Sequence, residues 1–250
     1  MRYLHQSLRE LQEFIKNKNM KKIYLLLSLT MSSIFMFGQA GPDQNKMGAW
    51  YMYFYNTTFN ESCWGIQGDI QYRNWNTFGD LEQLLIRSGI TYQPKNEKIK
   101  FTLGYANITT GEYGSSSSTV NENRIYQEAI FPSKFGKRFY LTHRFRFEQR
   151  LNENQNLRTR YRYNLFMNVP LNSTEMEKNT LYLALYNELF INGQRDIGNS
   201  NSVELFDRNR AYAALGFHIK NNLKVQLGVM KQATNNWVKN QLQLSLHHKI

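Results

Sequence analysis

Two neighbouring stretches decide the fold: FYLTHRFRFEQR at residues 139–150 and RTRYRYNLFMNV at residues 158–169. In both, aromatic or aliphatic residues alternate with charged or amide residues. A period of two indicates β-strands, because successive side chains of a strand point to opposite faces. The turn at Asn152–Asn156 joins the stretches into a hairpin that sets Glu148 opposite Arg160 and Arg146 opposite Arg162.

The arginines on the charged face of this hairpin are predicted to point into the interior of a barrel. In a transmembrane barrel the apolar face meets lipid and the polar face meets the interior. Arginines turned toward lipid would cost about 2–4 kcal/mol each near the bilayer midplane, and four of them would exceed the stability of many domains. We therefore expect Arg144, Arg146, Arg160 and Arg162 to point into the barrel.

The composition excludes several other classes of protein. The chain has 250 residues and a formal net charge of +12, with a pI near 9.7 and a mean hydropathy of −0.60. This hydropathy argues against several spanning helices but suits a barrel, in which half of each strand is polar. Nucleic-acid binding is not expected, because Lys and Arg alternate with apolar residues instead of forming an exposed basic stripe.

The N-terminal region predicts export. Met20-Lys21-Lys22 is a basic start, Ile23–Phe37 is an apolar run, and Gly38-Gln39-Ala40 offers small residues for cleavage. We interpret residues 20–40 as a signal peptide and residues 1–19 as an extension from an upstream start codon, a functional N-terminal helix being the alternative. Residues 47–250 would then form an outer-membrane barrel.

Eleven segments have strand character, and their lengths of about 9–12 residues suit tilted spanning strands. They are Ala49–Tyr55, Trp64–Arg73, Leu84–Tyr92, Ile99–Thr109, Arg124–Phe131, Phe139–Leu151, Arg158–Val169, Leu181–Ile191, Asn209–Ile219, Leu223–Lys231 and Trp237–His247. We predict an antiparallel up-and-down transmembrane β-barrel of 10–12 strands. An even number is expected if both termini lie in the periplasm. Either one more strand lies near Asn56–Trp64 or Thr77–Leu84, which gives twelve, or Ala49–Tyr55 is not part of the wall, which gives ten. Twelve is favoured. Long loops at Thr110–Asn123 and Asn192–Arg208 should face outward.

Several motifs resemble one family. They are Gln71-Tyr72-Arg73, Leu84-Leu85-Ile86-Arg87, His143–Arg150, Arg160-Tyr161-Arg162-Tyr163 and Asn187-Glu188. In this order they resemble the domain-of-unknown-function 2490 family (DUF2490) of Gram-negative outer-membrane proteins, over residues 47–250. The resemblance implies a β-barrel in the cell outer membrane and no assigned activity. The terminal Gln241–Ile250 is similar to the signal read by the barrel-assembly machinery, with Ile250 in place of the usual aromatic residue.

The candidate site is a set of charged residues predicted to face the interior and to bind anions. They are Arg73, Arg87, Arg144, Arg146, Glu148, Arg150, Arg158, Arg160, Arg162 and Glu188. Rings of arginine select anions in pores, so the set predicts a narrow passage for small anionic solutes. The alternative is a structural lattice in which several arginines share a few carboxylates and fill the barrel.

Catalysis is a less favoured interpretation, and the sequence predicts neither a cofactor nor a metal site. Cys63 is the single cysteine, so no internal disulfide or cysteine cluster can form. A barrel-embedded hydrolase acting on lipid or a surface substrate would need a Ser or Asp beside an interior or rim histidine. His143 is expected on the lipid face, and His247 and His248 on opposite faces. A third possibility is a partner-binding barrel that uses its outer loops.

Overall fold

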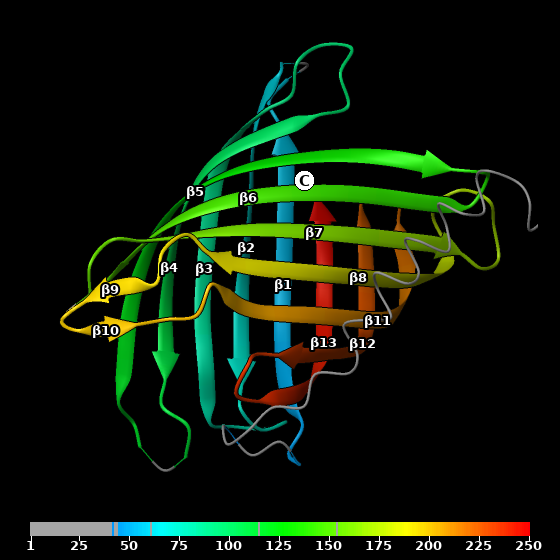
Figure 1. Ribbon diagram of the computed structural model, residues 1–250. Coiled ribbons are helices and arrows are strands. Elements are labelled where there is room, and N and C mark those ends of the chain that lie inside the picture. Colours follow the sequence, from blue (N-terminus) through cyan, green and yellow to red (C-terminus); the bar gives the residue numbers. More distant parts are fainter. Residues whose placement is uncertain (1–41, 43–44, 61, 115, 154) are drawn as a thin grey trace, which may run out of the picture. The chain divides into compact units, whose positions relative to one another are not determined.

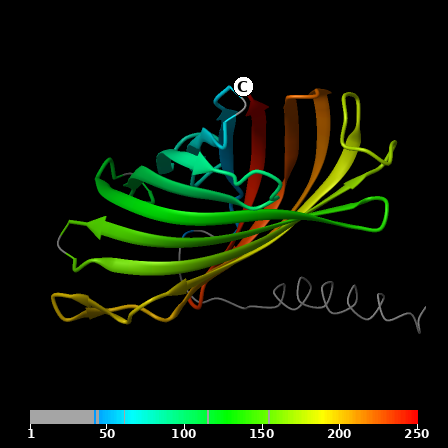
Figure 2. The ribbon, with the colours of Figure 1, turned by 90° about the horizontal axis from the view of Figure 1, so that it is seen from above.

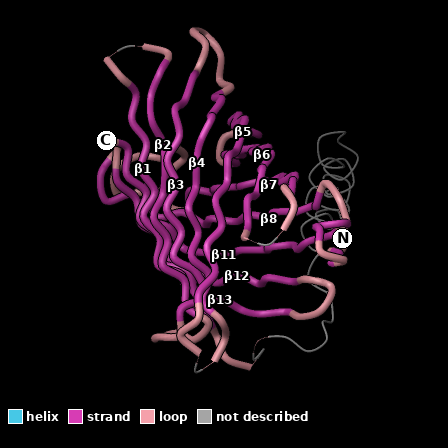
Figure 3. Tube along the Cα trace, turned by 90° about the vertical axis from the view of Figure 1, so that its left-hand side faces the viewer, coloured by secondary structure: helices cyan, strands magenta, loops and turns pink. Residues whose placement is uncertain are grey.

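A computed structural model describes residues 42, 45–60, 62–114, 116–153 and 155–250. The predicted extension at 1–19 and signal peptide at 20–40 lie outside these residues. Every regular element described is a β-strand (Figure 3). Within the described ranges, no helix has the length and apolar character needed to span a membrane.

Eleven long strands form the wall of a closed barrel (Figure 1). They are β1 (Gly48–Thr58), β2 (Trp64–Asn74), β3 (Leu81–Tyr92), β4 (Lys100–Gly111), β5 (Thr119–Phe135), β6 (Phe139–Asn152), β7 (Arg158–Pro170), β8 (Leu181–Asn192), β11 (Phe206–Lys220), β12 (Leu223–Ala233) and β13 (Val238–Lys249). Neighbours in sequence pair in antiparallel fashion, as predicted. The remaining strands, β9 (Asp196–Gly198) and β10 (Asn201–Ser202), form a separate small hairpin.

The expectation of an even number of strands is wrong. The barrel closes through a parallel pairing of β1 with β13, from Gly48 opposite Gln241 to Asn56 opposite Lys249. Parallel strands form a complete hydrogen-bond ladder, so one such pair lets an odd number of strands close without an edge. The segment Ala49–Tyr55 therefore belongs to the wall, and no twelfth strand completes the barrel in the described part of the chain. In Figure 1, β1 (blue) and β13 (red) lie side by side.

Parallel closure sets the start of β1 at the opposite end of the barrel from the C-terminus. The segment before β1 is held at this end by two hydrogen bonds to backbone carbonyls. Lys239 Nζ donates to the Lys46 oxygen at 2.7 Å, and Thr77 Oγ1 donates to the Met47 oxygen at 3.1 Å. We call this end the β1-start end and the other the C-terminal end.

Strands extend into both of the segments that were predicted to be long outer loops. Half of the predicted Thr110–Asn123 loop is strand, since β4 continues to Gly111 and β5 begins at Thr119. The β8–β11 connection remains long but folds into β9 and β10, and Ile197 of β9 is buried. The Ile197 carbonyl accepts a hydrogen bond from the Asn156 amide of the β6–β7 turn, which fixes the hairpin at the β1-start end.

The longest turn at the C-terminal end, residues 171–180, is tied to neighbouring strands. The Glu175 carboxylate accepts hydrogen bonds from the Tyr140 hydroxyl at 2.6 Å and from Lys134 Nζ at 3.1 Å. These two contacts lower the pKa of Glu175. The turn is thus anchored to β5 and β6, which explains how a length of ten residues is accommodated.

The outer face of the wall presents many large apolar side chains. Exposed aliphatic and aromatic side chains occur on strands all around the barrel, for example Ile70, Leu103, Phe145, Leu215 and Leu227. Seen from above, these strands surround one interior (Figure 2). Polar residues on the outer face pair with one another: His143 stacks on Phe131 and is hydrogen-bonded to the Tyr163 hydroxyl at 2.9 Å.

Large aromatic side chains fill part of the interior. One buried cluster joins β1, β8, β11 and β12 through Trp50, Tyr182, Ala184, Tyr212, Ala214 and Met230. Tyr182 lies opposite Gly216 in the register, and a Cβ atom at this glycine would come within 2.2 Å of the tyrosine ring. Tyr126 lies in the same way against Gly104. Glycine is therefore needed where a ring lies flat against the inner wall.

Candidate functional site

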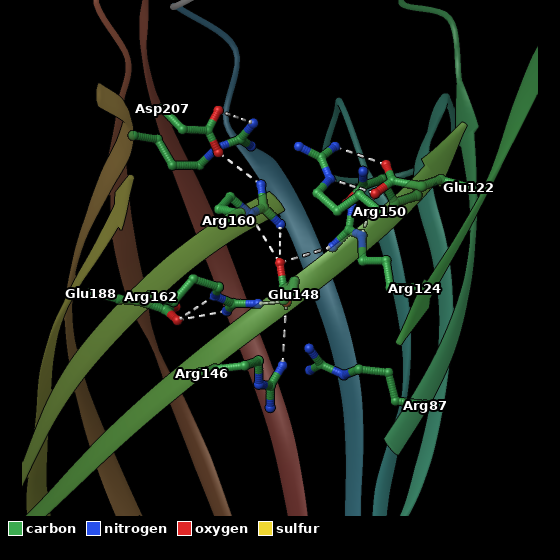
Figure 4. A network of polar contacts seen from close by, with 12 residues as sticks. Arg87, Glu122, Arg124, Arg146, Glu148, Arg150, Arg160, Arg162, Glu188 and Asp207 are labelled. Carbon is green, nitrogen blue, oxygen red and sulfur yellow. Dashed lines mark hydrogen bonds and ion pairs between the residues drawn. The ribbon is translucent and has the colours of Figure 1, made fainter. Parts of the chain in front are cut away.

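Glu148 of β6 is the centre of a network of arginines in the barrel interior (Figure 4). The residue is 1% exposed. Its two carboxylate oxygens accept hydrogen bonds from Arg160 Nη2 and Arg162 Nη1 of β7, each at 2.6 Å. Arg146 Nη1 lies 3.8 Å and Arg124 Nη1 3.9 Å from the same carboxylate. Four guanidinium groups thus share one buried carboxylate.

Other carboxylates extend the network along the wall. Glu188 of β8 binds Arg144 and Arg162 at 2.6 Å each, and Asp207 of β11 binds Arg160 at 2.7 Å. Further pairs are Glu122 with Arg124 and Arg150, Glu128 with Arg146 and Arg144, Asp69 with Arg87, and Asp207 with Arg208.

The strand register explains why these residues meet. Glu148 is directly opposite Arg160, as the hairpin pattern predicted, and Asp69 is directly opposite Arg87. Arg146 is likewise opposite Arg162, and like charges in such positions repel. Glu148, which binds Arg162 and lies 3.8 Å from Arg146, compensates for that repulsion.

Positive charge exceeds negative charge among the buried side chains. The buried set contains eight arginines and one lysine but only six carboxylates. Arg73 and Arg210 have no carboxylate within ion-pair distance in the described part of the chain. Both instead flank Trp50, with guanidinium carbons 3.9 and 4.7 Å from a ring centroid, and donate hydrogen bonds to glutamine side chains. The interior therefore carries a net positive charge.

The structure brings most of the predicted site residues together. Arg144, Arg146, Glu148, Arg150, Arg160, Arg162 and Glu188 belong to the network, and Arg87 is paired with Asp69. Two residues of the predicted set are not part of these ion pairs. Arg73 lies by Trp50, whereas Arg158 is half-buried and donates to Gln155 of the β6–β7 turn at 3.3 Å.

Several charged residues of the interior are absent from the predicted set, among them Glu82, Glu122, Arg124 and Asp207. The predicted strand began at Arg124, so Glu122 fell in a loop, although Glu122, Arg124 and Glu128 share one parity. Asp207 fell in the predicted outer loop in the same way. Glu82 lies where the β2–β3 register shifts at Arg73/Asn74, and such a shift breaks the alternation from which faces are predicted.

Two histidines have a serine within hydrogen-bond distance, as a hydrolase would require. Ser245 Oγ is 3.0 Å from His247 Nε2, and Ser133 Oγ is 3.5 Å from His143 Nε2. Ser245, however, is only 2% exposed, and His143 lies on the outer face. Among the residues described, no carboxylate is hydrogen-bonded to either histidine, so the orienting group of a catalytic triad is missing. The same residues contain no group of three or more His, Cys, Asp or Glu that could hold a metal ion.

Comparison with known proteins gives one match. The family described as "Protein of unknown function (DUF2490)" matches residues 47–243. This range includes ten of the eleven wall strands in full and the first half of β13. No curated protein and no solved structure matches the sequence.

Proposed function

Because the chain belongs to the DUF2490 family of proteins of unknown function, we propose a role from the barrel alone: an integral outer-membrane barrel whose braced, arginine-rich interior favours small anions. The apolar outer face supports the membrane location, since an outward apolar band is the general feature of barrels that lie in lipid. A groove of about 390 Å³ on this face, lined by aromatic rings such as Phe101, Phe145, Phe147 and Tyr161, suits a lipid acyl chain.

The observation that carries the anion preference is the excess of buried arginine over buried carboxylate. Fixed positive charge in a narrow interior attracts anions and repels cations. Arg73 and Arg210 contribute to this excess without forming an ion pair, since neither has a carboxylate within ion-pair distance among the described residues. Mobile anions would therefore interact with these two groups more strongly than with the paired arginines of the network.

The network itself supports a bracing role and a small passage. Contacts join strands that are not neighbours in the wall: Gln67 of β2 donates to Glu128 of β5 at 2.7 Å, and Tyr186 of β8 is 3.3 Å from Gln243 of β13. Such contacts hold strands that are three places apart in the wall at a fixed separation. They also fill the interior, so we expect a conductance well below that of a wide porin.

Planar-bilayer recording of the refolded protein tests this proposal. The wild type should give small, anion-selective currents, and Arg73→Gln/Arg210→Gln should lose the selectivity. Arg138→Gln, in the exposed β5–β6 turn, is the matched control and should behave as the wild type. Cation-selective currents, or none from protein that is demonstrably inserted, would refute the anion passage.

A further inference from the structure

Three basic residues form a row on the inner wall near the C-terminal end of the barrel. His218 of β11 is directly opposite Lys224 of β12, and Lys224 is directly opposite His247 of β13. Directly opposite residues have Cβ atoms about 4.5–5.5 Å apart. The row is thus built from three adjacent strands and belongs to neither the Glu148 network nor the Trp50 cluster.

The row has no negative partner in the described part of the chain. No ion pair or hydrogen bond of the Lys224 ammonium is found there. His218 is 7% exposed, and its two buried ring nitrogens have no partner of good hydrogen-bond geometry beyond a weak interaction with the Lys220 backbone. The His247 ring is hydrogen-bonded to the Ser245 hydroxyl and stacks on the ring of Phe54.

This arrangement is unusual when compared with the rest of the interior. In the Glu148 network, basic residues that face one another across two strands share a carboxylate. Here the Lys224 side chain lies between two imidazole rings without any carboxylate, and a partly buried ammonium group without a partner is unfavourable. Buried nitrogen donors without partners are similarly unfavourable. An anion that binds all three side chains would remove both costs.

The other side chains around the row are compatible with an anion. The Tyr182 ring lies 5.4 Å from the His218 ring, and its hydroxyl accepts a hydrogen bond from Gln226 at 3.0 Å. Lys224 and His247 are only half-buried, so solvent can reach the row. His218 is adjacent to the turn at 171–180, whose Asn179 amide donates to the His218 carbonyl.

We propose that His218, Lys224 and His247 form a binding site for a phosphate-type oxyanion, either free phosphate or a small phosphate monoester. Such an anion has several acceptor oxygens pointing in different directions. It can therefore accept from an ammonium group and from ring N–H groups on neighbouring strands, which lie about 4.8 Å apart. The inference requires the barrel fold and does not require conduction.

Isothermal titration of the full chain, refolded in detergent micelles at constant ionic strength, tests the site. Inorganic phosphate should bind with a stoichiometry of one. Lys224→Gln should weaken binding about tenfold or more, the loss expected for a hydrogen bond between charged groups. Lys224→Arg should retain binding. Lys231→Gln is the matched control, because Lys231 is on the same strand with its side chain on the outer face.

A parallel titration with glycerol phosphate separates the two sources of the anion, since tighter binding of either one identifies it. Absence of saturable binding of both ligands would overturn the site, as would equal binding by the wild type and Lys224→Gln. If Lys224→Gln does not fold, His247→Gln takes its place with the same two outcomes. If the barrel binds phosphate but gives no current in bilayers, the phosphate site stands and the anion passage is refuted. If it gives anion-selective currents but binds no phosphate, the anion passage stands and the phosphate site is refuted.

Discussion

At the scale of single residues, the stability of the barrel interior depends on how many arginines share each buried carboxylate. Glu148 is 1% exposed and has four arginines within 4 Å of its oxygens. A buried ion pair adds little net stability compared with a well-packed apolar pair, but removing one partner leaves an uncompensated buried charge. The change in the free energy of unfolding caused by a substitution is therefore set by the number of buried charged groups that it leaves without a partner.

We predict that Glu148→Gln destabilises the folded barrel by about 3–5 kcal/mol, because the arginines around it lose their shared carboxylate. Urea unfolding in lipid vesicles, followed by tryptophan fluorescence, measures the change. Glu153→Gln is the control, since Glu153 is exposed in the β6–β7 turn. It should change the free energy of unfolding by no more than about 0.5 kcal/mol. Equal effects of the two substitutions would show that the network contributes nothing to stability.

At the scale of elements, the parallel pairing of β1 with β13 is what closes the wall. Nine residue pairs join these strands, from Gly48 opposite Gln241 to Asn56 opposite Lys249. Without this pairing, both strands would present unpaired backbone groups, which lipid cannot satisfy. The closure therefore decides whether the proposed membrane location is physically possible.

A disulfide across this seam tests the closure. Tyr51 is opposite Leu244 in the register, and neighbouring strands lie about 4.8 Å apart, within the range that a disulfide can span. Tyr51→Cys/Leu244→Cys in a Cys63→Ser background should cross-link on oxidation and shift in non-reducing electrophoresis. Tyr51→Cys/Leu227→Cys, which places the second cysteine one strand further along the wall, should not. A cross-link in the control alone would require a different strand order.

At the scale of the whole molecule, the polarity of the barrel is the reverse of that of a soluble protein. Ion pairs and amides fill the interior, while the outer face presents aliphatic and aromatic side chains. Two tryptophans illustrate this arrangement. Trp50 is 2% exposed and lies between Arg73 and Arg210, whereas Trp64 is 52% exposed and packs at a tilt against Tyr92 at the outer wall.

We predict that these two tryptophans respond differently to lipid quenchers. In brominated phospholipid vesicles, a variant that keeps only Trp64 should be strongly quenched because its ring contacts acyl chains. A variant that keeps only Trp50 should retain its emission. Phe replaces the other tryptophans in each variant. Equal quenching of the two variants, or recovery of folded protein from water without detergent, would contradict the membrane location.

The sequence by itself determined the local features of this protein. Alternation with a period of two depends only on neighbouring residues, so it predicted the strands, their two faces and the register that sets Glu148 against Arg160. The predictions from alternation were wrong where strands ran beyond the alternating segments or where the register shifted. The strands that begin at Thr119 and Phe206 run through segments that looked like polar loops, and Glu82 follows a shift of register.

Only the tertiary structure decided how the strands close and which charges meet. The pairing of β1 with β13 joins segments almost 200 residues apart, and no periodicity records whether they run parallel or antiparallel. The sharing of Glu148 by four arginines and the row of His218, Lys224 and His247 likewise depend on strands that curve around one interior. Alternation assigns each of these side chains to one face of the sheet. Which side chains become neighbours on that face is decided by the closure of the barrel.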